Sequence, residues 1–334
     1  MIGGRRIAVA AAVAPVAAAG VVAAVVLPAD GSSSIRTDRW TALSPAPLAR
    51  TEVATARIGR FIYVVGGFES QSGRPTGGVE RYDIKRDRWR RVRSMPLTLD
   101  HATAVAHRGR LYVHGGYTRG LTVPTSALLA YDPRRNRWRR LRPARVARAA
   151  HAAAVIGDRL YVAGGANDSG SLRSLEIYDF ERRRWRSGPS FPGPPRNHTT
   201  GVAAGGRFYV LAGRDEGNLA VAERYDPRRR AWERLPDLRT PRGGIASARL
   251  SDGRIVVFGG ERPGPGGTTI AEVELFDARR GRWRSLPDLG TPRHGLGGVA
   301  FGDRATRSRA ACGPGSRSRT RSRRSTSGSG PCSR

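Results

Sequence analysis

Histidines recur at one position of a repeating pattern in this chain. Four of the six histidines occupy it: His101, His151, His198 and His294. The same position holds Glu52 in the first unit and Gly244 in the fifth. Imidazole and carboxylate groups can bind polar ligands, exchange protons or hold metal ions. This position is therefore the candidate ligand site of the chain.

Arginines precede the same position in several units, and with Glu52 and the histidines they complete the set of ligand-binding candidates: Arg148, Arg196, Arg242 and Arg293. We expect a polar pocket for a sugar or a peptide. The alternative is that these side chains are structural and hydrogen-bond neighbouring units. A shared metal ion is disfavoured, because histidines a full unit apart are expected to be too distant to reach one ion at about 2.1 Å each. We predict no metal, no cofactor and no catalytic residue.

The elements that position these residues repeat about every 48 residues. Each unit has a glycine doublet, a Tyr-Asp or Phe-Asp pair and a tryptophan. The doublets are Gly66-Gly67, Gly115-Gly116, Gly164-Gly165 and Gly259-Gly260, with Ala212-Gly213 as a variant. The tyrosines are Tyr82, Tyr131, Tyr178 and Tyr225, and the tryptophans are Trp40, Trp89, Trp138, Trp185, Trp232 and Trp283. Alternation with period two between turn clusters predicts four β-strands per unit.

This pattern resembles the kelch repeat over residues 34–303, so the expected fold is all-β. The resemblance implies a β-propeller of four-stranded blades around a central channel. It also implies that the glycines allow close backbone approach and that the aromatic rings pack between blades. Length predicts six blades, of which five are complete. Arg39–Leu43 is expected to supply the fourth strand of the sixth blade, and His294–Phe301 its first. The candidate site then lies at the channel mouth.

The first 30 residues are expected to be a signal peptide or a signal-anchor helix. Arg5 and Arg6 precede Ile7–Leu27, which contains no charged residue and is long enough to span a bilayer. We favour the anchor. Either form places the propeller outside the cytoplasm, anchored to the membrane or secreted.

The composition changes abruptly after Asp303. Residues 304–334 are rich in Arg, Ser and Gly, contain no acidic residue and include both cysteines, Cys312 and Cys332. We expect this tail to be disordered, and we favour a frameshift as its origin. The alternative is a genuine basic tail. If the tail is genuine, the predicted sixth blade lacks its middle strands and leaves an unpaired edge.

The chain has a formal net charge of +32, nearly all of it from arginine. Arginines crowd the expected turns between strands three and four of each blade: Arg134, Arg135, Arg137, Arg182, Arg183, Arg184, Arg228, Arg229, Arg230, Arg279, Arg280 and Arg282. We predict that this face meets an anionic membrane or cell-wall polymer. The alternative is solvated arginine that reflects codon usage. Nucleic acid is disfavoured, because no known nucleic-acid-binding motif is present.

The predicted function is a non-catalytic module that binds a protein or glycan through the face bearing the 2–3 and 4–1 loops. The resemblance also includes enzymes. Galactose-oxidase-like kelch enzymes need copper and a Cys–Tyr crosslink, and residues 34–303 contain no cysteine. A six-bladed kelch mutarotase for sialic acid is the alternative, in which Glu52, His151 and Arg196 would supply acid–base groups.

Overall fold

The computed structural model describes residues 25–26, 40, 42–263 and 267–301. The chain divides into two compact units, residues 1–302 and 303–334. The predicted tail 304–334 lies outside the described residues, as does the predicted signal segment 1–30 except for Val25–Val26. The strands of the described residues belong to the first unit.

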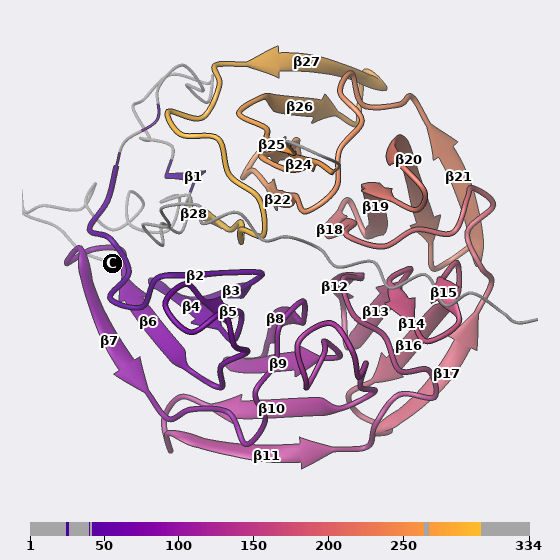
Figure 1. Cartoon of the computed structure of the whole chain (residues 1–334). Coiled ribbons are helices and arrows are strands. Elements are labelled where there is room, and N and C mark those ends of the chain that lie inside the picture. Colours follow the sequence, from indigo (N-terminus) through magenta and orange to yellow (C-terminus); the bar gives the residue numbers. More distant parts are fainter. Residues whose placement is uncertain (1–24, 27–39, 41, 264–266, 302–334) are drawn as a thin grey trace, which may run out of the picture. The chain divides into compact units, whose positions relative to one another are not determined.

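Five antiparallel four-stranded sheets surround a common centre (Figure 1). Blade 1 contains β3 (Ala54–Ile58), β4 (Phe61–Val65), β6 (Val79–Asp83) and β7 (Arg88–Val92). Blade 2 contains β8 (Thr103–His107), β9 (Arg110–His114), β10 (Leu128–Asp132) and β11 (Arg137–Leu141). Blade 3 contains β12 (Ala152–Ile156), β13 (Arg159–Ala163), β16 (Leu175–Asp179) and β17 (Arg184–Gly188).

Blade 4 contains β18 (Thr200–Ala204), β19 (Arg207–Arg214), β20 (Asn218–Asp226) and β21 (Ala231–Leu235). Blade 5 contains β22 (Ala246–Arg249), β23 (Ile255–Phe258), β26 (Val273–Asp277) and β27 (Arg282–Leu286). In each blade the strands pair in chain order, so the predicted meander is confirmed. The first strands are rich in alanine and contact one another around the centre, where only small side chains fit.

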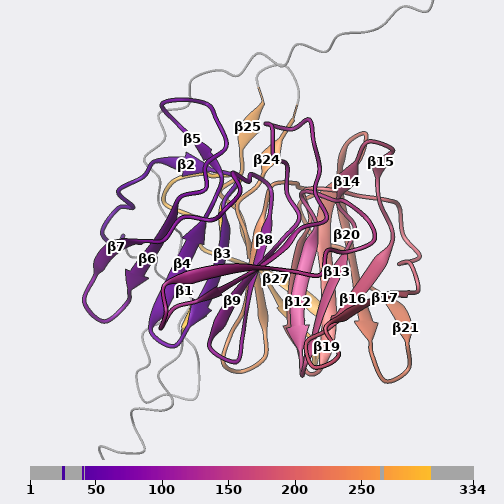
Figure 2. The ribbon, with the colours of Figure 1, turned by 90° about the horizontal axis from the view of Figure 1, so that it is seen from below.

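Three short two-stranded ribbons lie beyond the blades. Two extend loops between second and third strands, β14 (Ala166–Asn167) with β15 (Gly170–Ser171) and β24 (Glu261–Arg262) with β25 (Thr268–Thr269). In the third, β2 (Arg50–Thr51), which precedes the first strand of blade 1, pairs with β5 (Phe68–Glu69) in that blade's 2–3 loop. Figure 2 shows these ribbons at one end of the blades and the tight 1–2 and 3–4 turns at the other. Within the described part of the chain, no helix is long and apolar enough to cross a membrane.

The core lies between neighbouring blades, as the kelch resemblance implies. The ring of Tyr63 in blade 1 meets that of Tyr131 in blade 2 with centroids 6.0 Å apart, and Tyr161 meets Tyr225 at the same separation. The glycine doublets permit this close approach. Gly66 has φ +63, and a Cβ there would lie 2.3 Å from the carbonyl oxygen of Leu99 in the next blade. Any side chain at Gly66 would therefore push two blades apart.

The tryptophans link each blade to the preceding one. Each indole Nε1–H donates to a backbone carbonyl at 2.8–2.9 Å. The donor–acceptor pairs are Trp89–Ser44, Trp138–Arg93, Trp185–Arg142, Trp232–Pro189, Trp283–Pro236 and Trp40–Pro287. The bond from Trp40 to Pro287 joins the start of the propeller to the end of blade 5. Trp40 thus occupies the place of a sixth tryptophan in the ring.

The strands of the described residues form no sixth four-stranded sheet. Trp40 and residues 42–43 do not form the expected fourth strand. Within His294–Phe301 only β28 (Ala300–Phe301) is a strand, and it pairs in parallel with β1 (Val25–Val26), so these two residues of the predicted N-terminal helix are extended. Gly295 and Gly298 nevertheless lie between blades 1 and 5, because Val53 N donates to Gly295 O and Gly298 approaches Phe258. The rest of that blade lies outside the described residues.

Candidate functional site

A cavity of about 140 Å³ opens at the centre of the blades. The first strands and the residues just before them line it, with Glu52, His101, His151 and His198 among the polar side chains. The cavity therefore lies at the channel, where a polar pocket was predicted.

One residue per blade, just before the first strand, has a left-handed backbone. The residues and φ values are Glu52 (54°), His101 (50°), Ala150 (52°), His198 (49°), Gly244 (66°) and Gly295 (60°). Left-handed backbone costs a non-glycine residue roughly 1–2 kcal/mol. Hydrogen bonds between blades hold it in place: His101 N donates to Glu52 O at 3.2 Å, and Gly244 N donates to His198 O at 3.0 Å.

This backbone register corrects the predicted ring of histidines. Glu52, His101 and His198 are equivalent, but His151 lies one residue after its blade's ring position and His294 one residue before. The sequence held a signal for this shift, because the arginines before the first strands stand two residues before the ring position: Arg50, Arg148, Arg196, Arg242 and Arg293. Since successive side chains of an extended chain point in opposite directions, that shift changes what each histidine contacts.

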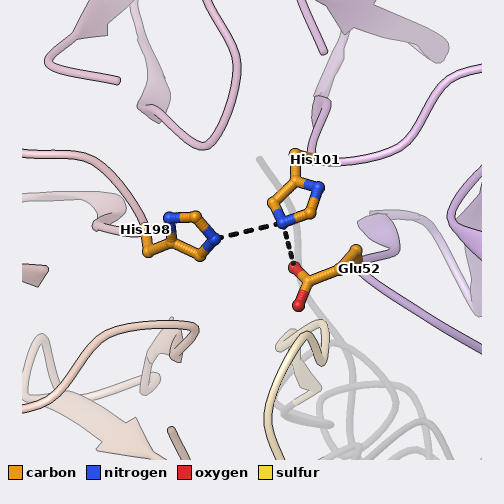
Figure 3. A group of neighbouring side chains, drawn as sticks. All are labelled: Glu52, His101 and His198. Carbon is orange, nitrogen blue, oxygen red and sulfur yellow. Dashed lines mark hydrogen bonds and ion pairs between the residues drawn. The ribbon is translucent and has the colours of Figure 1, made fainter. Parts of the chain in front are cut away.

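Three side chains meet at the channel mouth, and we call Glu52, His101 and His198 the channel-mouth cluster (Figure 3). His101 Nε2 lies 3.2 Å from Glu52 Oε2 and 3.1 Å from His198 Nε2. The three ligand atoms all lie within 4.8 Å of one another. Histidines one blade apart were expected to be too distant to share an ion, but His101 and His198, from blades 2 and 4, come together across the narrow channel.

Neighbouring side chains orient both imidazoles. His101 Nδ1 lies 2.7 Å from Asp100 Oδ1, and His198 Nδ1 contacts Asn197 Oδ1. The oxygens are acceptors, so each Nδ1 carries the proton and each Nε2 points into the cluster. Asn197 is held in turn, because its Nδ2 donates to Ser171 Oγ at 2.7 Å.

Charged groups surround the cluster on its open side. Arg214 Nη2 lies 2.8 Å from His198 Nε2, and Arg214 Nη1 forms an ion pair with Glu261. His294 Nε2 lies 3.8 Å from Glu52 Oε1 and 3.7 Å from Glu261 Oε2. The channel mouth thus presents hydrogen-bond donors and acceptors from blades 1, 2, 4 and 5 in a small space.

The two imidazoles of the cluster have opposite electrostatic surroundings. Burial lowers the pKa of His101, but the carboxylates of Glu52 and Asp100 outweigh it, so that the pKa lies above its ordinary value. Burial, with His101 and Arg214 nearby, holds the pKa of His198 well below its ordinary value. One histidine therefore favours the charged form and the other the neutral form.

His151 packs between blades 2 and 3. Its Nε2 lies 2.9 Å from His114 Nδ1 and 2.8 Å from Thr103 Oγ1, and its side chain is fully enclosed. A Cβ at Gly115 would lie 2.7 Å from the His151 ring, so this imidazole fills the space left by the glycine. The structure gives His151 a packing role.

The arginines before the first strands lie inside the blades instead of lining the cavity. Four of them form buried ion pairs with a glutamate of the third strand, with N–O distances of 2.6–3.1 Å: Arg50–Glu80, Arg148–Glu176, Arg196–Glu223 and Arg242–Glu274. Blade 2 has Leu99 and Leu129 at these two positions, both buried. This placement corrects the prediction that Arg148, Arg196 and Arg242 contact a ligand. Arg293 stands at the equivalent position, and burial lowers its pKa.

The residue after each glycine doublet was missed as a site position. Phe68 and Tyr117 pack edge-on against His101, with ring centroids 5.9 Å and 5.8 Å away, and Arg214 and Glu261 hold the same position in blades 4 and 5. A residue directly after the left-handed glycines returns toward the channel mouth. Reading the repeat register through the doublets would have identified all four.

The twelve arginines of the predicted basic turns are exposed. The Tyr-Asp aspartates shape these turns, since Asp226 Oδ1 accepts the backbone N–H groups of Arg228 and Arg229 at 2.9 and 3.3 Å. The same aspartates pair with arginines of the 1–2 turns, as in Arg207–Asp226 at 3.1 Å. Part of the charge on this face is therefore balanced locally.

The comparisons with known proteins agree with this architecture. The family model described as the KLHDC2/KLHL20/DRC7 Kelch-repeats domain matches residues 32–186 and 142–305. The solved structure titled "Structure of YjhT" is similar with a TM-score of 0.67 at 18% sequence identity, over 77% of this chain and 89% of that one. No curated protein matches the chain. The match over most of the sequence, together with the five blades, shows that the chain belongs to the kelch-repeat family of β-propellers.

Proposed function

We propose that this protein is a non-catalytic binding module that holds a protein or a glycan at the channel mouth and the surrounding 2–3 loops. The observation that supports it is the concentration of polar groups from four blades around the channel-mouth cluster. Hydrogen bonds between blades and the fixed backbone of the ring residues hold these groups in place. The protein therefore loses little conformational entropy when a ligand binds.

The loops add surface of a different character around this polar centre. Leu121 and Val123 at the tip of the blade 2 loop are exposed by 57% and 41%. Asp215 and Glu216 lie in the 2–3 loop of blade 4 and are exposed. A face that carries both apolar and charged loop residues suits contact with a peptide segment or with the apolar face of a sugar ring.

The proposal includes export. The uncharged run Ile7–Leu27 after Arg5 and Arg6 supports a signal-anchor or a cleaved signal, which would place the propeller on the outer side of the cell membrane or release it. A tagged full chain, fractionated and treated with protease on intact cells, tests this. Protection from external protease in intact cells would contradict it.

The binding proposal is tested with the full chain on a glycan array and in pull-downs from extracellular protein, both in the presence of a chelator. Arg214→Ala should weaken the captured interaction by about tenfold or more, because it removes charged donors from the mouth. Arg229→Ala, on the opposite face, is the matched control and should bind as the wild type does. Equal binding by both variants would contradict the proposed site, and turnover of sialic acid or aldoses in a mutarotation assay would contradict a non-catalytic role.

A further inference from the structure

We propose that Glu52, His101 and His198 form a zinc-binding site at the channel mouth. Zinc in proteins is tetrahedral, with His nitrogens and carboxylate oxygens at about 2.0–2.2 Å, so neighbouring ligands lie roughly 3.4 Å apart. In the channel-mouth cluster the separations from His101 Nε2 are 3.2 Å to Glu52 Oε2 and 3.1 Å to His198 Nε2. These two separations match neighbouring corners of a tetrahedral site, and the third, between Glu52 and His198, lies within 4.8 Å (Figure 3).

The orientation of the imidazoles independently supports a cation. Asp100 and Asn197 accept from Nδ1 of His101 and His198, so both Nε2 atoms face the cluster, beside the carboxylate of Glu52. A metal ion would take the place of the proton on His101 Nε2 and of the Arg214 donor at His198 Nε2. The Asp100–His101 contact at 2.7 Å is also the carboxylate–histidine arrangement that orients metal-ligating imidazoles.

The backbone holds the three side chains in this geometry. Glu52, His101 and His198 have φ values of 54°, 50° and 49°, a conformation rare for such residues. Their blades are linked by backbone hydrogen bonds, including His101 N to Glu52 O at 3.2 Å. Local strain kept by the surrounding structure is a feature of preorganised sites.

Two nitrogens and one carboxylate oxygen favour zinc over harder cations. Calcium and magnesium take oxygen ligands almost entirely, whereas imidazole suits zinc and its transition-metal neighbours. A fourth position remains toward the open side of the cluster, where His294 and Glu261 lie. A water molecule or a ligand group would complete the tetrahedron there.

Arg214 competes with the metal for His198. Its Nη2 lies 2.8 Å from His198 Nε2, so this guanidinium must turn away for zinc to bind, and its ion pair with Glu261 gives it another partner. The structure therefore assigns Arg214 as the residue that limits zinc affinity. We therefore expect that removing the positive charge of Arg214 tightens zinc binding.

The test uses the metal-free full chain carrying Cys312→Ser and Cys332→Ser, so that the two cysteines cannot bind the metal. Titration with zinc in a calorimeter should give one ion per chain, and cobalt should give the visible absorption of a tetrahedral site. His198→Ala or Glu52→Gln should weaken zinc by on the order of 100-fold, and Asp100→Asn by about 10- to 100-fold. Arg214→Gln should bind zinc several times more tightly.

His107→Gln is the control, because this histidine stacks on Phe180 with ring centroids 4.1 Å apart, away from the cluster. It should bind zinc as the wild type does, and circular dichroism checks that each variant folds. Absence of stoichiometric zinc in folded protein, or unchanged affinity in His198→Ala, would overturn the site, as would loss of zinc on removal of the cysteines alone. This experiment measures metal affinity, whereas the search for a protein or glycan ligand is carried out with a chelator present. Either proposal can therefore fail without the other.

Discussion

At the scale of single residues, the buried pair His114 and His151 is the most pH-sensitive feature of the packing between blades. Burial, with Arg148 nearby, lowers the pKa of His114 to about 3. Burial, with His114 and Arg148 nearby, also holds the pKa of His151 well below its ordinary value. Both side chains are therefore neutral in the folded protein at pH values where the unfolded chain binds protons.

We expect the folded state to lose stability as the pH falls below about 6.5, the ordinary histidine value, toward the lowered folded values. Each histidine contributes a slope of up to about 1.4 kcal/mol per pH unit in this window. The double variant His114→Val/His151→Thr uses the residues that stand at these positions in blades 1 and 4, Val65 and Thr199. Urea unfolding measures the free energy of unfolding between pH 7 and 4.5. This free energy should fall less steeply with decreasing pH in the double variant than in the wild type, and equal slopes would contradict the prediction.

The site residues show where sequence reasoning succeeds and where it ends. Glu52, His101 and His198 were predicted from the repeat and do converge. His151 and His294 were placed at the same position, but a one-residue shift separates them from the ring. The histidines alone did not reveal that shift, but the arginines do, since Arg148 stands two residues before Ala150 as Arg196 does before His198.

At the scale of the blade, the strand pattern follows from local sequence, but the buried ion pairs do not. Alternation, turn clusters and glycine doublets predicted the strands of blades 1 to 5. The arginines were read as ligand contacts because nothing in their spacing shows that a glutamate two strands away faces them. Leu99 and Leu129 in blade 2 are the clue, because both members of the pair are replaced together by apolar residues.

This replacement predicts the outcome of a double-mutant cycle in blade 4. Arg196→Leu should lower the free energy of unfolding by about 3–5 kcal/mol, because it leaves Glu223 buried without its partner. Arg196→Leu/Glu223→Leu should recover most of that loss, since it recreates the apolar pair of blade 2. Denaturant unfolding of both variants measures this, and a double variant no more stable than the single one would show that the ion pair itself is required.

At the scale of the propeller, the two faces differ in charge. The 3–4 turns bear exposed arginines, and the opposite face bears the channel mouth and loops that carry acidic, basic and apolar residues. Figure 2 shows these turns and loops at opposite ends of the blades. The meander topology was predictable from the strand order, and it places all these turns together. The extent of local pairing, such as Arg207 with Asp226, was not predictable, because it depends on how adjacent turns meet.

We expect the basic face to bind vesicles that contain anionic lipid. Each arginine near such a surface contributes about 1 kcal/mol, so reversing Arg228, Arg229 and Arg230 to Glu should weaken binding by about tenfold or more. Reversing the exposed Arg74, Arg119 and Arg173 of the 2–3 loops changes the net charge equally on the other face and is the matched control. Co-sedimentation at low and physiological salt measures both, and equal losses would point to net charge alone.

The ring of tryptophan hydrogen bonds implies an order of assembly during synthesis. From Trp89 to Trp283 each indole donates to a carbonyl that the ribosome has already made, so every blade can dock on a completed predecessor. Trp40 is the exception, because its acceptor, Pro287, is synthesised 247 residues later. Trp40 must therefore wait for nearly the whole propeller, and its bond to Pro287, together with the bond from Val53 N to Gly295 O, closes the ring of blades.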